Sequence, residues 1–321
     1  MRVALVLGSG GARGYAHIGV IDALRERGFD IVGISGSSMG ALVGALQAAG
    51  TLDEFTSWAS SLTQSAVLRL LDPSLTAAGV LRAEKILAAV REIIGPRTIE
   101  SLPIPFTAVS TDLIAGKSVW LQRGPIDAAI RASIAIPGVI APYLLDGRLL
   151  ADGGILDPLP MAPLAAVNAD LTIAVSLNAS DPTPPTDSPS ATAELMSRMR
   201  RSTTSLIDRA AASTLLDGPT ARSVLSRFSN AVDGFDPIAE ADDDTDDPPM
   251  PRLGGFEVMN RTIEISQAAL MRHTLAAYPP DLLIEVPRTV CRSLEFYRAD
   301  EVIEIGHELG CAALDSLNLG T

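Results

Sequence analysis

Apolar runs alternate with stretches of helical periodicity along the first fifty residues of this chain. Residues 3–7 and 30–35 are short apolar runs typical of buried strands, and residues 15–27 and 41–49 space their apolar side chains as amphipathic helices do. A glycine follows each of the two helical segments, at the position where a helix C-cap glycine is expected. The order strand, helix, strand, helix predicts a parallel sheet with right-handed crossovers.

The same patterns predict further elements beyond residue 50. Helices are expected over residues 53–71, 82–94, 126–135, 256–278 and 299–317. Strands are expected over residues 106–111, 118–121, 171–177 and 282–286, and a hairpin over residues 143–151. The hairpin turns at Asp146-Gly147, a dipeptide typical of tight two-residue turns. The whole pattern indicates the α/β fold class.

The composition changes over residues 180–255. Residues 178–190 are rich in Pro, Ser, Thr and Asp, and residues 233–251 form an acidic tract that contains several prolines. A helical pattern at residues 192–216 lies between these two stretches. Such composition is typical of a surface insertion. We therefore expect one domain over residues 1–321, with a low-complexity acidic insertion or lid at about 180–255.

Charge and cysteine content narrow the function classes. The net charge of −13 argues against a nucleic-acid partner, because phosphate binding needs clustered Lys and Arg. The two cysteines, Cys291 and Cys311, are too few for a disulfide framework and indicate reduced thiols. No apolar run reaches the roughly eighteen residues of a membrane span. We expect a cytoplasmic protein, with peripheral contact at a membrane left open.

The turn GSGGARG, residues 8–14, follows the first apolar run and opens a helix. Backbone N–H groups in such a turn favour a negative charge. The dinucleotide fingerprint is broken, because its third glycine position holds Arg13, and a P-loop is excluded because Tyr15 follows Gly14 instead of lysine. The turn thus predicts an anion site without a nucleotide cofactor.

The stretch GSSMG places G-x-S-x-G between an apolar run and a helix. In that context a serine occupies a tight turn with its hydroxyl exposed, and the flanking glycines allow the backbone to cross closely. Ser38 is therefore the candidate nucleophile, with Gly36 and Gly40 as the elbow glycines. Ser35, Ser37 and Ser9 lack this pattern of flanking glycines and are interpreted as turn or cap residues.

A nucleophilic serine needs a base, and the residues alone leave several candidates. Asp152 follows a strand and precedes two glycines, a position that also suits a simple turn residue. A hydrolase triad in the order Ser, acid, His would combine Ser38 and Asp152 with His273 or His307. His17, on the first helix, is the third histidine. The choice between a histidine and an aspartate base stays open at this point.

Four stretches in order carry a resemblance to the patatin-like phospholipases, in particular the bacterial group related to the neuropathy target esterase catalytic domain. They are GGARG at 10–14, GSSMG at 36–40, ASIAIPGVIAP at 132–142 and DGG at 152–154. The resemblance covers about residues 1–178 and resumes over 279–315, whereas residues 180–255 depart from the family pattern.

This resemblance implies a three-layer α/β/α fold with a mainly parallel central sheet and a Ser38–Asp152 catalytic dyad. It also implies a glycine-rich oxyanion hole, built from Gly10, Gly11, Ala12, Arg13 and Gly14. Arg13 would steady that turn, contact a substrate phosphate or form only a surface salt bridge. The implied substrate is a lipid or another acyl ester, with no metal or organic cofactor. The alternatives are a Ser-His-Asp esterase and a catalytically silent lipid-binding or regulatory protein.

Overall fold

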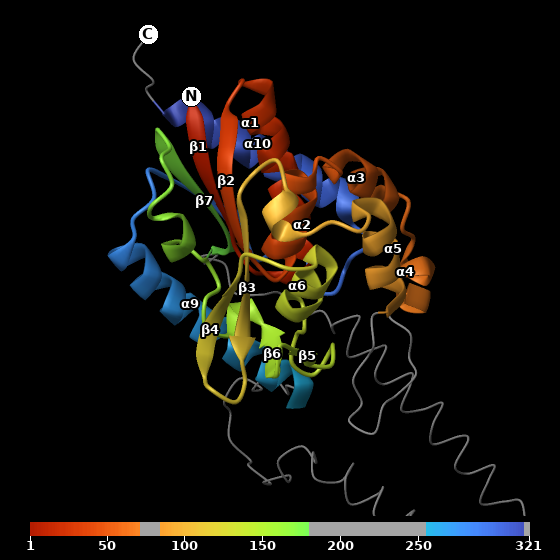
Figure 1. Ribbon diagram of the computed structural model, residues 1–321. Helices are drawn as coiled ribbons and strands as arrows, with labels where there is room; N and C mark the ends of the chain where they lie inside the picture. The colour runs from red at the N-terminus through yellow and green to blue at the C-terminus, as the bar shows by residue number, and fades with distance from the viewer. Residues whose placement is uncertain (71–83, 180–254, 318–321) are drawn as a thin grey trace, which may run out of the picture. The chain divides into compact units, whose positions relative to one another are not determined.

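The computed structural model describes residues 1–70, 84–179 and 255–317 (Figure 1). The chain divides into two compact units, one formed by Met1–Pro184 with Ile263–Thr321 and the other by Pro185–Thr262. The first unit contains the sheet and the candidate site. The helix predicted at 192–216 and the acidic tract at 233–251 lie outside the described residues.

Eight strands in the described part of the chain form one mixed sheet (Figure 1). They are β1 (Arg2–Leu7), β2 (Asp30–Ser37), β3 (Phe106–Asp112), β4 (Lys117–Leu121), β5 (Tyr143–Leu145), β6 (Arg148–Asp152), β7 (Leu171–Ala179) and β8 (Leu282–Pro287). Their order is β5-β6-β3-β2-β1-β7-β8, and β4 pairs separately with β3. The pairs β3–β2, β2–β1, β1–β7 and β7–β8 are parallel, and the pairs that involve β4, β5 or β6 are antiparallel. The expected mainly parallel sheet is confirmed.

The helices follow the sequence pattern, with one correction. They are α1 (Ala16–Glu26), α2 (Met39–Ala49), α3 (Leu52–Ser60), α4 (Gln64–Leu70), α5 (Glu84–Ile94), α6 (Ile126–Ser133), α9 (Gly255–Ala277) and α10 (Ala299–Ser316). The single helix expected at 53–71 is wrong, because Thr63 interrupts it and its hydroxyl accepts the Ala66 N–H at 3.2 Å to start α4. Among the described residues, no helix combines the length and apolar character needed to cross a membrane.

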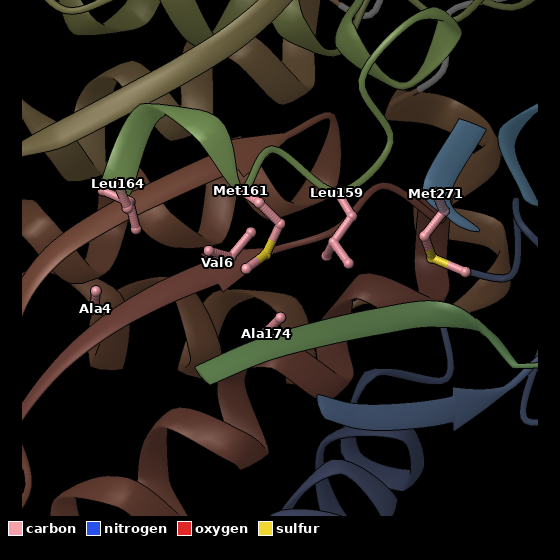
Figure 2. Packing of buried hydrophobic residues seen from close by; sticks show 7 residues of the cluster. All are labelled: Ala4, Val6, Leu159, Met161, Leu164, Ala174 and Met271. Atoms are coloured by element: carbon pink, nitrogen blue, oxygen red, sulfur yellow. The ribbon is translucent and has the colours of Figure 1, made fainter. Parts of the chain in front are cut away.

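Helices cover both faces of the sheet, and this explains why residues 3–7 of β1 are all apolar. Successive side chains of β1 point to opposite faces, so burial of all five residues after the exposed Arg2 requires cover on both sides. On one face, Val6 packs in a cluster with Met161 and with Met271 of α9 (Figure 2). On the other face, Gly44 of α2 lies against the side chain of Ile34 in β2. The result is the expected three-layer α/β/α arrangement.

Helices α1 and α10 cross at close range on the α2 side of the sheet. A Cβ added to Gly19 of α1 would collide with the Ile303 carbonyl, and one added to Gly306 of α10 would collide with the Ala16 carbonyl. The two helix backbones therefore touch where they cross. Because α1 directly follows the 3₁₀ turn Gly11–Tyr15, this crossing helps to hold the glycine-rich turn in place.

Candidate active site

Sheet register brings Ser38 and Asp152 together although they are 114 residues apart. Ser37, the last residue of β2, pairs with Val109 of β3, and the next residue of β3, Ser110, pairs with Asp152 at the end of β6. The Ser38 hydroxyl donates a hydrogen bond to Oδ2 of Asp152 at 2.5 Å. The site thus lies at the carboxyl end of β2, where ligands bind in open α/β sheets.

The backbone around Ser38 forms a sharp turn from β2 into α2. Ser38 has a φ of 55° and a ψ of −123°, an unusual conformation for a residue with a side chain. A Cβ at Gly36 would collide with the Gly40 carbonyl, and one at Gly40 would collide with the Leu7 carbonyl. The two glycines are therefore required by close backbone contact. This is the geometry of a nucleophile elbow.

Ser133 supports the site, and the sequence reasoning did not single it out. Its hydroxyl accepts the Ser38 N–H at 3.0 Å and donates to the Val109 carbonyl at 2.6 Å. Two residues further on, the Ala135 carbonyl accepts the Asp152 N–H at 3.0 Å. The segment 132–142 thus positions both Ser38 and Asp152. The one signal for Ser133 was its place inside that family-like stretch.

Burial makes Asp152 a stronger base than an ordinary carboxylate. The side chain is 4% exposed, and this desolvation raises its pKa from 3.8 to about 6, against the opposing hydrogen bonds from Ser38 and from the Gly154 N–H. At pH 7 about nine-tenths of such a group is ionised. Asp152 can therefore accept a proton from Ser38 at neutral pH.

The glycine-rich turn leaves two backbone donors beside the strand end. The N–H groups of Gly8, Ser9 and Ala12 donate to carbonyls elsewhere in the fold, at 2.8 to 3.0 Å. Within the described part of the chain, neither Gly10 nor Gly11 donates its N–H to a backbone carbonyl. Gly11 adopts a φ of +59°, which favours glycine. Two N–H groups are thus left for an anion.

Arg13 is buried and holds the turn from inside. Its Nε donates to the Gly10 carbonyl at 3.2 Å, and its Nη2 donates to Glu264 of α9 and to the Ser293 hydroxyl, each at 3.3 Å. Ser293 also accepts the Ala12 N–H through its carbonyl. Of the three roles expected for Arg13, these contacts match that of steadying the turn, and burial of the side chain argues against a surface salt bridge.

All three histidines lie in the described part of the chain, and none is hydrogen-bonded to Ser38. His17 is buried and donates from Nε2 to the Gly8 carbonyl at 2.8 Å, and burial lowers its pKa to about 4. Nε2 of His307 is 2.9 Å from Oε2 of Glu26 on the α1–α10 surface. His273 is exposed on α9. The hydroxyl of Ser38 is directed to Asp152.

The chain is an α/β protein in which Ser38 lies in a strained turn between the parallel strand β2 and the helix α2. The family model described as patatin-like phospholipase matches residues 5–165. The chain belongs to the patatin-like phospholipase family. Membership of this family supports a lipid hydrolase in general terms.

Relatives of two degrees of similarity match the chain. It is 66% identical over 333 residues to an uncharacterized NTE family protein of Mycobacterium tuberculosis, a match that covers 99% of this chain and 92% of the relative. It is 32% identical over 188 residues to the human patatin-like phospholipase domain-containing protein 6, which covers 56% of this chain and 14% of that protein. Among solved structures, VipD from Legionella pneumophila aligns with a TM-score of 0.44 and 16% identity, over 98% of this chain and 66% of that one.

Proposed function

We propose that this protein is a serine acyl hydrolase that cleaves acyl esters of lipids with a Ser38–Asp152 dyad. The observation that carries the proposal is the 2.5 Å hydrogen bond from the Ser38 hydroxyl to the buried Asp152 carboxylate. The strained elbow at Ser38 and the membership of the patatin-like phospholipase family support the same assignment. The proposal requires neither a metal nor an organic cofactor.

The reaction follows from the position of one base beside one nucleophile. Asp152 accepts the proton of Ser38 as Oγ attacks the ester carbonyl, and collapse of the tetrahedral intermediate expels the alcohol, which takes the proton from Asp152. Asp152 then deprotonates a water molecule that attacks the acyl-serine. The fatty acid leaves and Ser38 regains its proton. A histidine is not needed, because the raised pKa of Asp152 suits it to this proton transfer.

We assign to the turn at residues 10–14 the stabilisation of the negative charge that develops on the substrate carbonyl oxygen. The N–H groups of Gly10 and Gly11, which have no backbone acceptor among the described residues, are the donors, since Ala12 uses its own N–H to bind Ser293. Loss of one such donor costs about 3–4 kcal/mol of transition-state stabilisation. Arg13 keeps the turn in position, and Gly14 leaves room for the side chain of Met39, the residue after the nucleophile.

Peripheral contact with a lipid surface is the second part of the proposal. Ile114 at the tip of the β3–β4 hairpin is 81% exposed, and Leu144 on β5 is 68% exposed. Leu113 lies beside Ile114 in the turn that follows β3. It comes three residues after Ser110, the partner of Asp152 in the sheet, and three residues of extended chain span about 10 Å. Ile114→Asp should reduce sedimentation with phosphatidylcholine vesicles while hydrolysis of a soluble ester persists; equal sedimentation would remove this contact from the proposal.

Labelling with a fluorophosphonate tests the enzyme assignment. The intact protein should react once, Ser38→Ala should abolish the label, and Ser37→Ala should retain it as a control one residue away. Phospholipid and soluble ester turnover should disappear with Asp152→Asn and persist with His273→Gln and His307→Gln. Loss of turnover in either histidine variant would favour a Ser-His-Asp esterase. Intact protein that resists labelling and cleaves no ester would support a silent lipid-binding protein instead.

A further inference from the structure

Three side chains with different metal-binding atoms meet where the end of α1 lies beside α10. Glu26 is the last residue of α1, and His307 and Cys311 lie one turn apart on α10. Nε2 of His307 is 2.9 Å from Oε2 of Glu26 and 3.8 Å from Sγ of Cys311, and the three ligand atoms all lie within 4.8 Å of one another. We propose that Glu26, His307 and Cys311 bind a Zn²⁺ ion, with water completing its coordination.

The distances suit a tetrahedral ion. Zn²⁺ binds nitrogen and oxygen at about 2.0–2.2 Å and sulfur at about 2.3 Å, so neighbouring ligand atoms in a tetrahedral site are about 3.4–3.6 Å apart. The separations from Nε2 of His307, 2.9 Å to Oε2 of Glu26 and 3.8 Å to Sγ of Cys311, lie on either side of this value. Because Nδ1 of His307 is also 3.9 Å from Sγ, the imidazole must turn to direct one nitrogen at the ion. Glu26 is exposed, so its carboxylate can move outward to admit the ion without disturbing the packing. A set of one thiolate, one imidazole and one carboxylate favours Zn²⁺ over Mg²⁺ or Ca²⁺.

The α1–α10 crossing holds the three ligands close together before any ion arrives. Gly306 and Gly310 directly precede His307 and Cys311 in their turns of α10. A Cβ at Gly306 would collide with the Ala16 carbonyl, and one at Gly310 would lie 3.2 Å from Cα of Val20. Close contact between the helix backbones therefore fixes the spacing, which lowers the ordering cost of metal binding.

The surroundings favour a cation. A hollow of about 470 Å³ borders Glu26 and His307, and among the described residues its lining adds the carboxylates of Asp22, Asp300 and Glu304 and the guanidinium of Arg25. Arg25 is itself paired with Asp22 and Asp53. The excess of carboxylates leaves a negative field over the site.

Arg27 completes the environment of the cysteine. Its Nη1 donates to Sγ of Cys311 at 3.1 Å, and its Nη2 is paired with Asp315 at 2.7 Å. A donor to the sulfur stabilises the metal-bound thiolate, as outer hydrogen bonds do at zinc sites. Binding releases the Cys311 thiol proton to solvent, and the ion then bridges the end of α1 to α10. Because α1 follows the turn at residues 10–14, the ion would brace the helix behind the proposed oxyanion site.

Titration of the full-length, reduced and chelator-stripped protein with Co²⁺ tests this site without reference to activity. We expect one Co²⁺ per chain, with a sulfur-to-cobalt charge-transfer band that Zn²⁺ abolishes by displacement. Cys311→Ser should eliminate the band, and His307→Gln should weaken binding by at least about 100-fold. Cys291→Ala should leave both unchanged, because Cys291 is buried outside the cluster.

Zn²⁺ should also raise the Tm of the wild-type protein and of Cys291→Ala, but not that of Cys311→Ser. Circular dichroism checks that each variant is folded. If Cys311→Ser does not fold, the loss of Co²⁺ affinity in His307→Gln is used to test the site instead. The proposal is overturned if the wild type forms no Co²⁺ complex, if the complex lacks a sulfur band, or if the band survives Cys311→Ser. It would be overturned equally by loss of the band in Cys291→Ala.

Discussion

Replacing Asp152 with asparagine should stabilise the folded protein at neutral pH while it abolishes turnover. Burial raises the pKa of Asp152 from 3.8 to about 6. At about 1.4 kcal/mol per pKa unit, the ionised carboxylate is roughly 3 kcal/mol less favourable in the fold than in the unfolded chain. This cost is absent below the unfolded pKa, grows as pH rises, and is complete above the folded pKa. Asparagine never incurs it.

The free energy of unfolding of Asp152→Asn relative to wild type should therefore rise by about 3 kcal/mol between about pH 4 and about pH 7. Guanidinium unfolding followed by circular dichroism at several pH values measures this, and the difference between the two proteins cancels the other titrating groups. Asp157→Asn is the matched control. Burial also raises the pKa of Asp157 to about 6, so this variant should show the same sign of pH dependence yet keep its turnover. A difference for Asp152→Asn that is flat or falls with pH would refute the reasoning.

Three further predictions concern the same site. Because Asp152 must be ionised to act as the base, kcat/KM for a neutral ester should fall about tenfold per pH unit below about pH 6, and a profile flat to pH 5 would contradict its role. Gly40→Ala should destabilise the fold by about 3 kcal/mol or more in denaturant titrations, because its Cβ would collide with the Leu7 carbonyl. Gly50→Ala is the control: its Cβ would enter open space at a φ of +72°, so this substitution should cost only about 1 kcal/mol. Equal costs for the two variants would contradict the close-contact argument. Ser133→Ala leaves the Ser38 N–H without its acceptor, so the free energy of unfolding should fall by about 1–3 kcal/mol and kcat should fall as well. Ser133→Thr keeps a hydroxyl and should restore both. An unchanged kcat in Ser133→Ala would show that the turn at Ser38 holds its geometry without this hydrogen bond.

Local pattern was enough to predict most elements of the sheet. The apolar run at residues 3–7 forms β1, and its neighbours in the sheet were found from the same kind of run. The Asp146-Gly147 hairpin turn has φ values of 51° and 74°, as the dipeptide predicted. These features depend on side-chain alternation and on positive φ values, both of which are local properties of a chain. The break at Thr63 was missed, because apolar spacing alone cannot show which hydroxyl will cap a helix.

Motifs identified Ser38 and Asp152 one at a time, and left three histidines as rival partners. Their hydrogen bond depends on the register between β3 and β6, which places Asp152 opposite Ser110. Strand β3 is also the neighbour of β2, the strand that leads into Ser38. No spacing in the sequence encodes that register, since it results from pairing between strands far apart in the chain. The support from Ser133 has the same origin, because it joins α6 to the elbow across 95 residues.

The chain therefore determined by itself where strands, helices, the elbow and the glycine-rich turn would form, because each depends on neighbouring residues. Tertiary structure alone decided which side chains meet. Glu26 and His307 are 281 residues apart, and only the close crossing of α1 and α10 sets them 2.9 Å from one another beside Cys311. Ser38 likewise has Asp152 as its partner because the strands pair as they do. Distances between remote residues follow from packing, which the local pattern of hydrophobic and polar positions does not contain.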